Sequence, residues 1–230
     1  PIFMISNVNL IGQGEEVSIL YAEQTREECE MFHSPYSTNQ CGGVIIMDEC
    51  ENNIISALTI TGGFTGVIEA YSGGGVYLDY SSLTLLDVIF NDNSAIYGGG
   101  IYIDHSTLTL IDVTFNNNMA SGSGGGLHLS NSSNSTLTNV TFSDNDSGNG
   151  GGVSMWGGGC GNHTLTNVQF IDNVAGHAGG GMFIEGSNSN ITLTDVEFIG
   201  NTAEECGGMT FRGGPTFPEY YGNLTLSNVI

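Results

Sequence analysis

Apolar residues in this chain of 230 residues follow a pattern that repeats along most of its length. A phenylalanine marks one point of each repeat, an asparagine follows it three residues later, and a run of glycines leads into a short alternating apolar segment. The phenylalanines are separated by 25, 27, 28 and 28 residues and are Phe90, Phe115, Phe142, Phe170 and Phe198. Self-similarity at a nearly fixed period indicates one supersecondary unit stacked on copies of itself.

Within a repeat, apolar and polar positions alternate, as in strands with one buried face. Before Phe115 the apolar positions are Val113, Leu110 and Leu108, and the step of three residues between Val113 and Leu110 breaks the alternation. Two inward-facing strands must therefore meet at a bend. The residue at the bend is always Asp or Asn, which tolerate the left-handed backbone conformation. The predicted bend residues are Asp87, Asp112, Asn139, Asn167 and Asp195.

A third strand follows the glycines, beginning for example at Val76, Ile101 and Leu127. Three strands and three corners per repeat, stacked in parallel, predict an all-β solenoid of triangular section. Parallel crossovers are overwhelmingly right-handed. We therefore expect a right-handed, single-stranded parallel β-helix of about seven or eight turns, with 25–28 residues per turn.

Stacking should place equivalent side chains of successive turns in columns. The phenylalanines predict an aromatic stack in the core. The asparagines predict a ladder of amides bonded to one another and to the corner backbone. A column that serves every turn alike is interpreted as structural rather than as a site. The ladder asparagines are Asn93, Asn118, Asn145, Asn173 and Asn201.

FxxN alternating with GGx(I/L/V) resembles the repeat signature of the polymorphic outer membrane protein family. FxxN occurs five times, and the resemblance covers roughly residues 41–230. The glycine triplets that precede Val, Ile, Leu or Met start at Gly73, Gly98, Gly124, Gly150 and Gly179. The resemblance implies a secreted, surface-displayed β-helix used for adhesion or as a structural element. It names no catalytic residue.

The repeat predicts one domain over residues 1–230. Residues 14–40 break the pattern and are expected to be an irregular insertion, in which residues 22–32 are compatible with a short helix. We place Leu10 at the phenylalanine position of a first, degenerate turn. Both ends of the sequence lie inside a turn without a capping segment, and solenoids need caps. We therefore expect continuation into a longer chain or end-to-end self-association.

The net charge is −22, from 24 Asp and Glu against 2 Lys and Arg. A strongly acidic surface disfavours nucleic acid and anionic membranes as partners. The chain contains no apolar run of the ~20 residues that a membrane-spanning helix needs. Because no compact D-x-D-x-D run offers a calcium cage, we expect diffuse cation binding at most, no metal site and no cofactor. The expected location is extracellular or at the cell surface.

Cysteines and sequons suggest extracellular chemistry. A disulfide among Cys29, Cys41 and Cys50 is predicted, with the pairing left open. N-x-S/T sequons mark surface glycosylation acceptors in a secreted protein. Asn145 carries a sequon but belongs to the amide ladder, so we expect it to be too engaged to carry sugar. The better candidates lie at corners and are Asn131, Asn134, Asn162, Asn190 and Asn223.

The outward face of the third strand is the candidate ligand surface. Aromatic side chains beside carboxylates suit sugar rings, which offer apolar C–H faces and hydroxyl groups. The aromatic residues expected on this glycan-contact face are Tyr77, Tyr102, Trp156 and Phe183.

Asp79 and Asp104 are predicted to lie one turn apart on the same strand edge, and paired carboxylates act as acid and base in glycoside hydrolysis. β-Helix enzymes that cut polysaccharides also use Arg or Lys, by fold-level analogy. Lysine is absent here, and Arg212 is predicted about four turns from Asp104. We therefore expect a non-catalytic structural or adhesive surface protein, a stalk or fibre subunit with a glycan or cell-surface ligand. The alternative is a polysaccharide-acting enzyme that uses Asp79 and Asp104.

Overall fold

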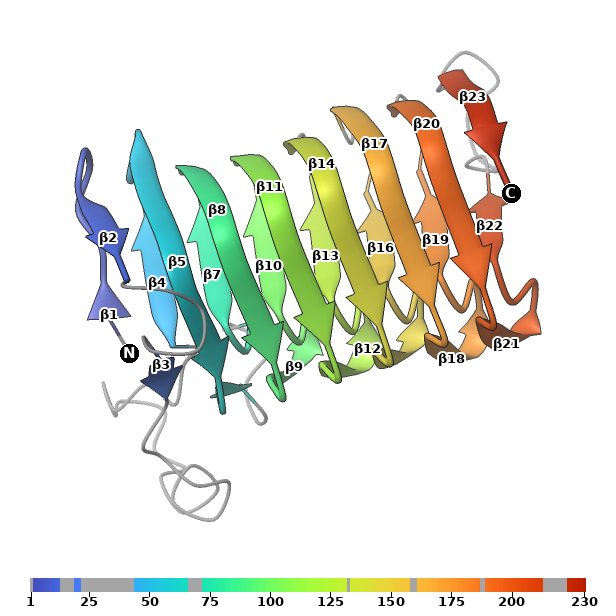
Figure 1. The fold of residues 1–230 in the computed structure, drawn as a ribbon, viewed down its shortest axis with the longest axis horizontal. Helices are drawn as coiled ribbons and strands as arrows, with labels where there is room; N and C mark the ends of the chain where they lie inside the picture. The colour runs from blue at the N-terminus through green and yellow to red at the C-terminus, as the bar shows by residue number, and fades with distance from the viewer. Residues whose placement is uncertain are drawn as a thin grey trace.

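The computed structural model describes residues 2–12, 19–21, 44–65, 72–131, 133–157, 161–186, 189–212 and 223–230. These residues form a parallel β-solenoid whose turns follow one another along a single axis (Figure 1). No helix occurs in the described ranges. The expected all-β fold is confirmed.

Three parallel sheets run along the axis. The glycine sheet, named for the residues that precede most of its strands, contains β1 (Ile2–Phe3), β4 (Ile45–Asp48), β7 (Val76–Asp79), β10 (Ile101–Asp104), β13 (Leu127–Ser130), β16 (Val153–Trp156), β19 (Met182–Glu185) and β22 (Met209–Arg212). The bent sheet contains β2 (Asn9–Ile11), β5 (Asn53–Thr61), β8 (Ser82–Asn91), β11 (Thr107–Asn116), β14 (Asn134–Ser143), β17 (Asn162–Ile171), β20 (Asn190–Ile199) and β23 (Asn223–Val229), with β3 (Ile19–Tyr21) also paired to β5. The short sheet contains β6 (Phe64–Thr65), β9 (Ser94–Tyr97), β12 (Met119–Ser123), β15 (Asp146–Asn149), β18 (Val174–Ala178) and β21 (Thr202–Glu205).

Within the described residues, six consecutive turns contain a strand of each sheet. The glycine and bent sheets extend further, to eight and nine strands. The prediction of seven or eight turns is therefore wrong for complete turns. It holds only when the incomplete turns at both ends are included.

Three strands per turn is the correct number, but the strands are not the predicted ones. The two segments that meet at the bend belong to one continuous strand, as in β11, where Asp112 has a φ of 55° inside the strand. The other four predicted bend residues have φ values between 51° and 56°. The short sheet was not predicted, because its strands of two to five residues are too short to display an alternating pattern.

The first turn differs from the predicted frame. Leu10 pairs with Ile55, which precedes the bend, whereas Leu20 of β3 pairs with Ile60, and Ile60 pairs with Phe90. Leu20 therefore occupies the phenylalanine position, and the predicted insertion at residues 14–40 contains a strand of the solenoid. The alternating pattern is the same on either side of a bend, so alternation alone could not assign Leu10. The predicted helix at residues 22–32 lies outside the described residues.

The phenylalanines form the expected stack along the core. Successive ring centroids lie 4.8, 4.7, 5.1 and 4.8 Å apart, and the rings are within 10° of parallel. The first four are fully buried. Offset or edge-to-face arrangements are the usual preference of aromatic pairs. Nearly parallel rings at these centroid distances form an offset stack, and strand register aligns them, because it repeats the same side chain in each successive turn.

The asparagine ladder runs beside this stack. Asn145 shows its geometry: its Nδ2 donates to Asn173 Oδ1 at 2.9 Å and to the backbone oxygen of Phe115 at 3.1 Å. Its Oδ1 accepts from the backbone N–H and the Nδ2 of Asn118, both at 3.0 Å. All polar atoms of this fully buried amide are thus satisfied.

A serine ladder, which sequence analysis missed, holds the corner between the glycine sheet and the bent sheet. The Oγ of Ser81 accepts the backbone N–H of Cys50, and the Oγ of Ser106 accepts that of Ser81, each at 2.9 Å. Each hydroxyl also donates to the backbone oxygen two residues earlier, at Asp79 and Asp104. The ladder therefore fixes the strand ends that carry these two aspartates.

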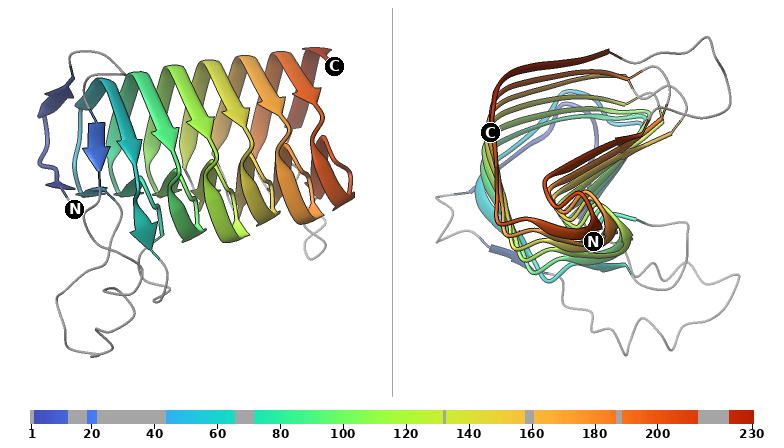
Figure 2. Two further views of the ribbon diagram at one scale, coloured as in Figure 1. Left: turned by 60° about the horizontal axis from the view of Figure 1, so that its bottom comes forward. Right: turned by 90° about the vertical axis from the view of Figure 1, so that its right-hand side faces the viewer.

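Viewed along the axis, the turns superimpose in a roughly triangular outline that curls inward at one corner (Figure 2).

Glycines allow the close backbone approach between the short sheet and the glycine sheet. A Cβ on Gly125 would lie 2.5 Å from Gly151 O and 2.7 Å from Asp146 O. Only glycine fits there, because the obstructing atoms belong to the backbone and cannot move aside.

Gly125→Ala is expected to destabilise the protein by roughly 3 kcal/mol or more, because a methyl group would overlap two carbonyl oxygens. Thermal and denaturant unfolding followed by circular dichroism would measure the loss. The matched control is Gly176→Ala, where a Cβ would meet no atom closer than 3.9 Å. Equal stabilities of the two variants would contradict the packing argument.

Asn145→Leu is expected to cost roughly 3–5 kcal/mol, because it leaves buried backbone and amide groups of two neighbouring turns without partners. The control is Asp146→Ala, since the adjacent exposed position is occupied by Met119 and Val174 in the neighbouring turns. Denaturant unfolding at constant pH would compare them. A cost below about 1 kcal/mol for Asn145→Leu would show that the ladder is dispensable.

Candidate functional site

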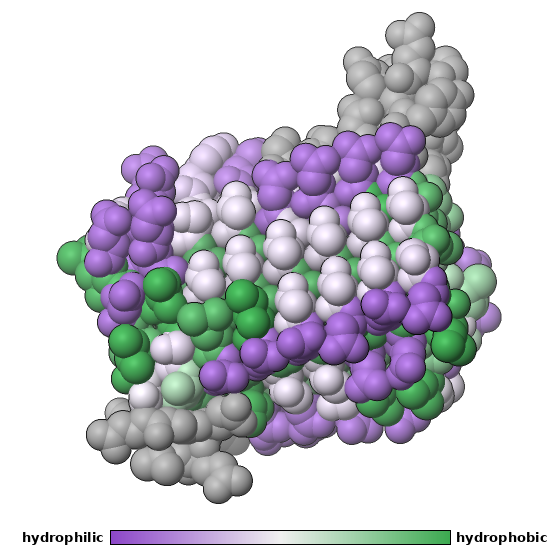
Figure 3. Space-filling model, turned by 45° about the horizontal axis from the view of Figure 1, so that its top comes forward, coloured by the Kyte–Doolittle hydropathy of each residue, from purple (hydrophilic) through white to green (hydrophobic). Residues whose placement is uncertain are grey.

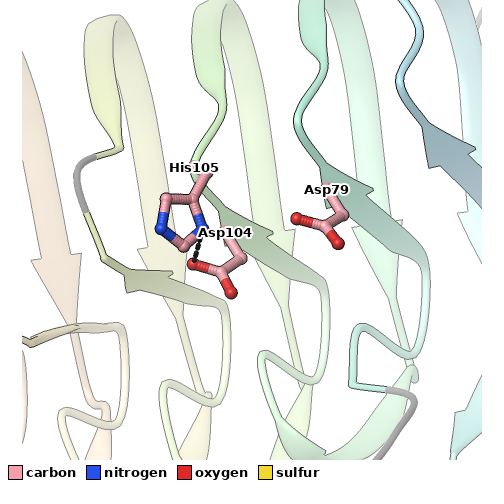
Figure 4. Close-up of side chains that lie close together, drawn as sticks. All are labelled: Asp79, Asp104 and His105. Atoms are coloured by element: carbon pink, nitrogen blue, oxygen red, sulfur yellow. Dashed lines mark ion pairs between the residues drawn. The ribbon is translucent and has the colours of Figure 1, made fainter.

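Two aspartates and a histidine lie close together where two neighbouring strands of the glycine sheet end. Asp79 ends β7 and Asp104 ends β10, and the two residues are paired in register. His105 follows Asp104 at the corner. Single ligand atoms of the three side chains lie within 4.8 Å of one another (Figure 4). The predicted proximity of the aspartates is therefore present, and His105 is a member that sequence analysis did not include.

The two carboxylates have different surroundings. Asp104 Oδ1 lies 3.0 Å from His105 Nδ1 and accepts a hydrogen bond of 2.8 Å from Asn131 Nδ2. The His105 ring also stacks on Tyr80, with the centroids 4.8 Å apart. Asp104 is therefore held by two donors when His105 carries its proton on Nδ1.

Asp79 Oδ1 is buried and has no hydrogen-bond partner. Burial raises the pKa of Asp79, and the neighbouring charges of Asp104 and Asp48 raise it further, while His105 opposes them. One carboxyl group is thus biased toward its protonated form, and the other accepts hydrogen bonds. Acid–base chemistry on a glycoside uses a pair of carboxyl groups, and the raised pKa of Asp79 is in the direction that a general acid requires.

The same three side chains could supply part of a cation's coordination shell. Calcium takes six to eight oxygen ligands, more than two carboxylates and one imidazole provide. A second acidic region lies at the corner after the asparagine ladder, where a groove of about 270 Å³ is lined by residues that include Asp92, Asp144 and Asp146. Diffuse cation binding there stays a prediction.

The predicted glycan-contact face is only partly open. Tyr77 and Tyr102 stack with centroids 5.6 Å apart and are partly exposed, and Trp156 is 48% exposed. Phe183, by contrast, is 3% exposed, and the Arg212 guanidinium lies 5.4 Å from its ring centroid. The structure therefore does not place Phe183 on an open face.

The cause is the inward curl of the chain before the glycine sheet. Tyr97, the last residue of β9, packs on His128, with ring centroids 5.3 Å apart. His128 lies in the same register row as Tyr77 and Tyr102, which was expected to face outward. His128 and Ser154, which are paired in register in this row, are both buried. Burial also raises the pKa of Tyr77 and Tyr102 above the ordinary tyrosine value.

Four of the five candidate sequon asparagines are the first residues of successive strands of the bent sheet and form a column. Asn190 Nδ2 donates to Asn162 Oδ1, and Asn223 Nδ2 donates to Asn190 Oδ1, both at 2.9 Å. Asn134 heads this column, accepting the backbone N–H of Asn162. Asn131 lies elsewhere and donates its amide to Asp104. Glycosylation stays a prediction, and it would compete with these amide contacts.

Cys50 is a free, buried cysteine whose Sγ lies 2.9 Å from Met4 O. Cys29 and Cys41, the other disulfide candidates, lie outside the described residues. Cys206 is free and exposed. No helix of the described residues is long and apolar enough to cross a membrane.

The family model for the right-handed β-helix region matches residues 3–142 and 74–228. These matches together span nearly the whole chain, so the protein belongs to the right-handed β-helix family. The predicted handedness is confirmed. This fold occurs both in non-enzymatic adhesins and in enzymes that act on polysaccharides. No curated protein and no solved structure matches the chain significantly.

Two histidines are buried in the solenoid. His163 faces the core, its Nδ1 lies 2.9 Å from Ser135 Oγ, and burial lowers its pKa to about 4. Burial lowers the pKa of His128 to about 3. Both stay neutral in the native protein, whereas the unfolded chain binds protons below about pH 6.5. The contribution of these groups to stability is complete above pH 6.5 and falls as the pH approaches 4 for His163 and 3 for His128.

Between pH 6.5 and 4, the free energy of unfolding is expected to fall by up to about 3 kcal/mol less in His163→Leu than in wild type. Leucine suits the site, because Leu108 occupies the same column. Denaturant unfolding at several pH values would measure the slope, and the control is His177→Leu at an exposed position. Parallel curves for wild type and His163→Leu would contradict a buried neutral histidine.

Proposed function

We propose that this protein is a non-catalytic structural and adhesive module of an extracellular or cell-surface rod, a segment of a stalk or fibre. The resemblance to the polymorphic outer membrane protein repeats supports a surface-displayed role. The strongly acidic composition supports an ion-rich exterior. A glycan or another cell-surface ligand is the proposed partner.

The observation that carries the proposal is the continuity of the ladders. Phenylalanine rings stack through five successive turns, and asparagine amides are linked over the same turns. Each turn is therefore fastened to its neighbours in the core, at a corner and along three sheets. Such a body is a stiff rod, because a local bend would separate all of these contacts at once.

Association of copies end to end is part of the proposal. The outermost strands of a parallel solenoid present the same unpaired backbone groups that join the turns within it. A second copy in register would extend every sheet. Rods longer than one copy in negative-stain images would support this arrangement, and strictly monomeric particles would count against it.

We assign adhesion to the exposed aromatic and acidic side chains at the C-terminal ends of the strands of the glycine sheet. Trp156 lies in the same register column as Asp79 and Asp104. The exposed indole offers a flat apolar surface to the C–H face of a sugar, and carboxylates accept hydrogen bonds from its hydroxyl groups. Tyr77 and Tyr102 extend this surface.

A second candidate function is polysaccharide hydrolysis at Asp79 and Asp104. The raised pKa of Asp79 suits a general acid, and Asp104, with donors from His105 and Asn131, lies beside it. Their atoms lie within the short separation that is typical of retaining glycosidases. In this alternative Asp79 would act as the general acid and Asp104 as the second carboxylate.

Incubation of the purified chain with neutral and acidic polysaccharides would separate the two functions. We expect retention on at least one polysaccharide without release of new chain ends. Trp156→Ala should weaken retention by roughly tenfold, the effect of about 1.4 kcal/mol. The matched control is Ile199→Ala, an equally exposed apolar residue of the bent sheet.

If wild type cleaves a polysaccharide and both Asp79→Asn and Asp104→Asn abolish this activity, hydrolysis rather than adhesion is the function. Neither retention nor turnover would leave only the structural role. Binding that is unaffected by Trp156→Ala would place the adhesive surface elsewhere.

A further inference from the structure

One face of the bent sheet carries two straight ranks of outward side chains, which we call the threonine face. The first rank is Thr84, Thr109, Thr136, Thr164, Thr192 and Thr225. The second rank, two residues further along each strand, is Leu86, Ile111, Thr138, Thr166, Thr194 and Ser227. Figure 3 shows a regular array of near-neutral side chains there, flanked on both sides by hydrophilic rows.

The array has two fixed repeats. Strand pairing sets a spacing of ~4.8 Å from turn to turn, and two residues along a strand span ~6.7 Å. The register is unbroken across these strands between Thr84 and Ser227. The threonine face is therefore a regular array of hydroxyl and methyl groups, in which Leu86 and Ile111 supply apolar groups alone.

Strand propensity alone does not account for this uniformity. Threonine suits any exposed strand position. Past the bend, however, the outward row of the same strands changes at almost every turn and is Ile89, Thr114, Thr141, Gln169 and Glu197. The first rank is threonine in all six turns. The uniformity is thus confined to one face.

Charge is also excluded from the threonine face. The chain has a net charge of −22, yet neither rank contains Asp, Glu or Arg. Acidic residues lie at the bend beside it, at Asp87, Asp112 and Asp195. A surface that bound a cation or a basic partner would carry charge, so a neutral, periodic ligand fits better.

The side chains of the face are held in place. Threonine is β-branched, which restricts χ1, and Thr109, Thr136, Thr164 and Thr192 of the first rank each lie between threonines of the two adjacent turns. The stacked amides of Asn134, Asn162, Asn190 and Asn223 border the first rank. The hydroxyl positions are therefore set before any ligand arrives, which lowers the entropic cost of binding.

We propose that the threonine face binds ice. Hydroxyl groups at two fixed repeats can hold first-shell waters in a repeating arrangement, and a lattice of water is the ligand that this arrangement favours. Methyl groups between them restrict alternative water arrangements. An ice surface carries no net charge, and neither rank of the face carries a charged side chain. The proposal goes beyond the adhesive role and uses a different side of the molecule from Trp156.

The test is partition of the 230-residue protein, produced without N-glycosylation, into a slowly growing ice hemisphere. Wild type should be enriched in the ice and should shape single ice crystals. The double variant Thr164→Tyr/Thr166→Tyr should reduce enrichment at least tenfold, because two rings at the centre of the face hold the lattice away. Thermal unfolding would verify that the variant remains folded.

The matched control is Thr141→Tyr, which adds the same ring on a strand of the bent sheet but past the bend. It should partition like wild type. Exclusion of wild type from ice, or equal loss in the control, would overturn the proposal. Retention on crystalline cellulose or chitin that Thr164→Tyr/Thr166→Tyr loses and Trp156→Ala keeps, without enrichment in ice, would also overturn it and identify a polysaccharide lattice as the ligand. These outcomes are independent of the Trp156 binding assay.

Discussion

The structure depends on one constraint, the in-register hydrogen bonding of each turn to the next. Parallel strands repeat at a single spacing, so a residue in one turn lies directly above its equivalent in the neighbouring turn. A shift of one residue would turn every inward side chain outward. The phenylalanine stack, the asparagine ladder and the serine ladder all require this register, and each of them in turn resists a shift.

Inward and outward columns obey different rules. An inward column must satisfy the same space and the same hydrogen bonds in every turn, so it tolerates little variation. The pair of Ser135 and His163 is an exception, since it interrupts an apolar column and introduces a buried titratable group. Outward columns carry no such constraint. The column that contains Asp79 and Asp104 changes from turn to turn. The first rank of the threonine face, in contrast, repeats the same residue.

The fold by itself does not select a function. A right-handed β-helix provides a stiff frame with several long faces, and adhesins and polysaccharide enzymes use the same frame. In this chain the end of the glycine sheet combines carboxylates, a histidine and an exposed indole, whereas the threonine face is neutral and periodic. Two faces of one solenoid thus differ in their chemistry, because the same register aligns different side chains into separate columns.

Much of the fold could be predicted because its signals are local and repeated. The sequence by itself determined the parallel solenoid, the left-handed bend residues and the columns of phenylalanine and asparagine, since each follows from spacing within one repeat. The tertiary structure alone decided that Leu20, not Leu10, fills the phenylalanine position, because an alternating segment fits either side of a bend. It also decided that Phe183 is covered and that His105 joins Asp104. Those outcomes depend on how the chain curls at its corners, and corner geometry leaves no mark on the alternation of polar and apolar residues.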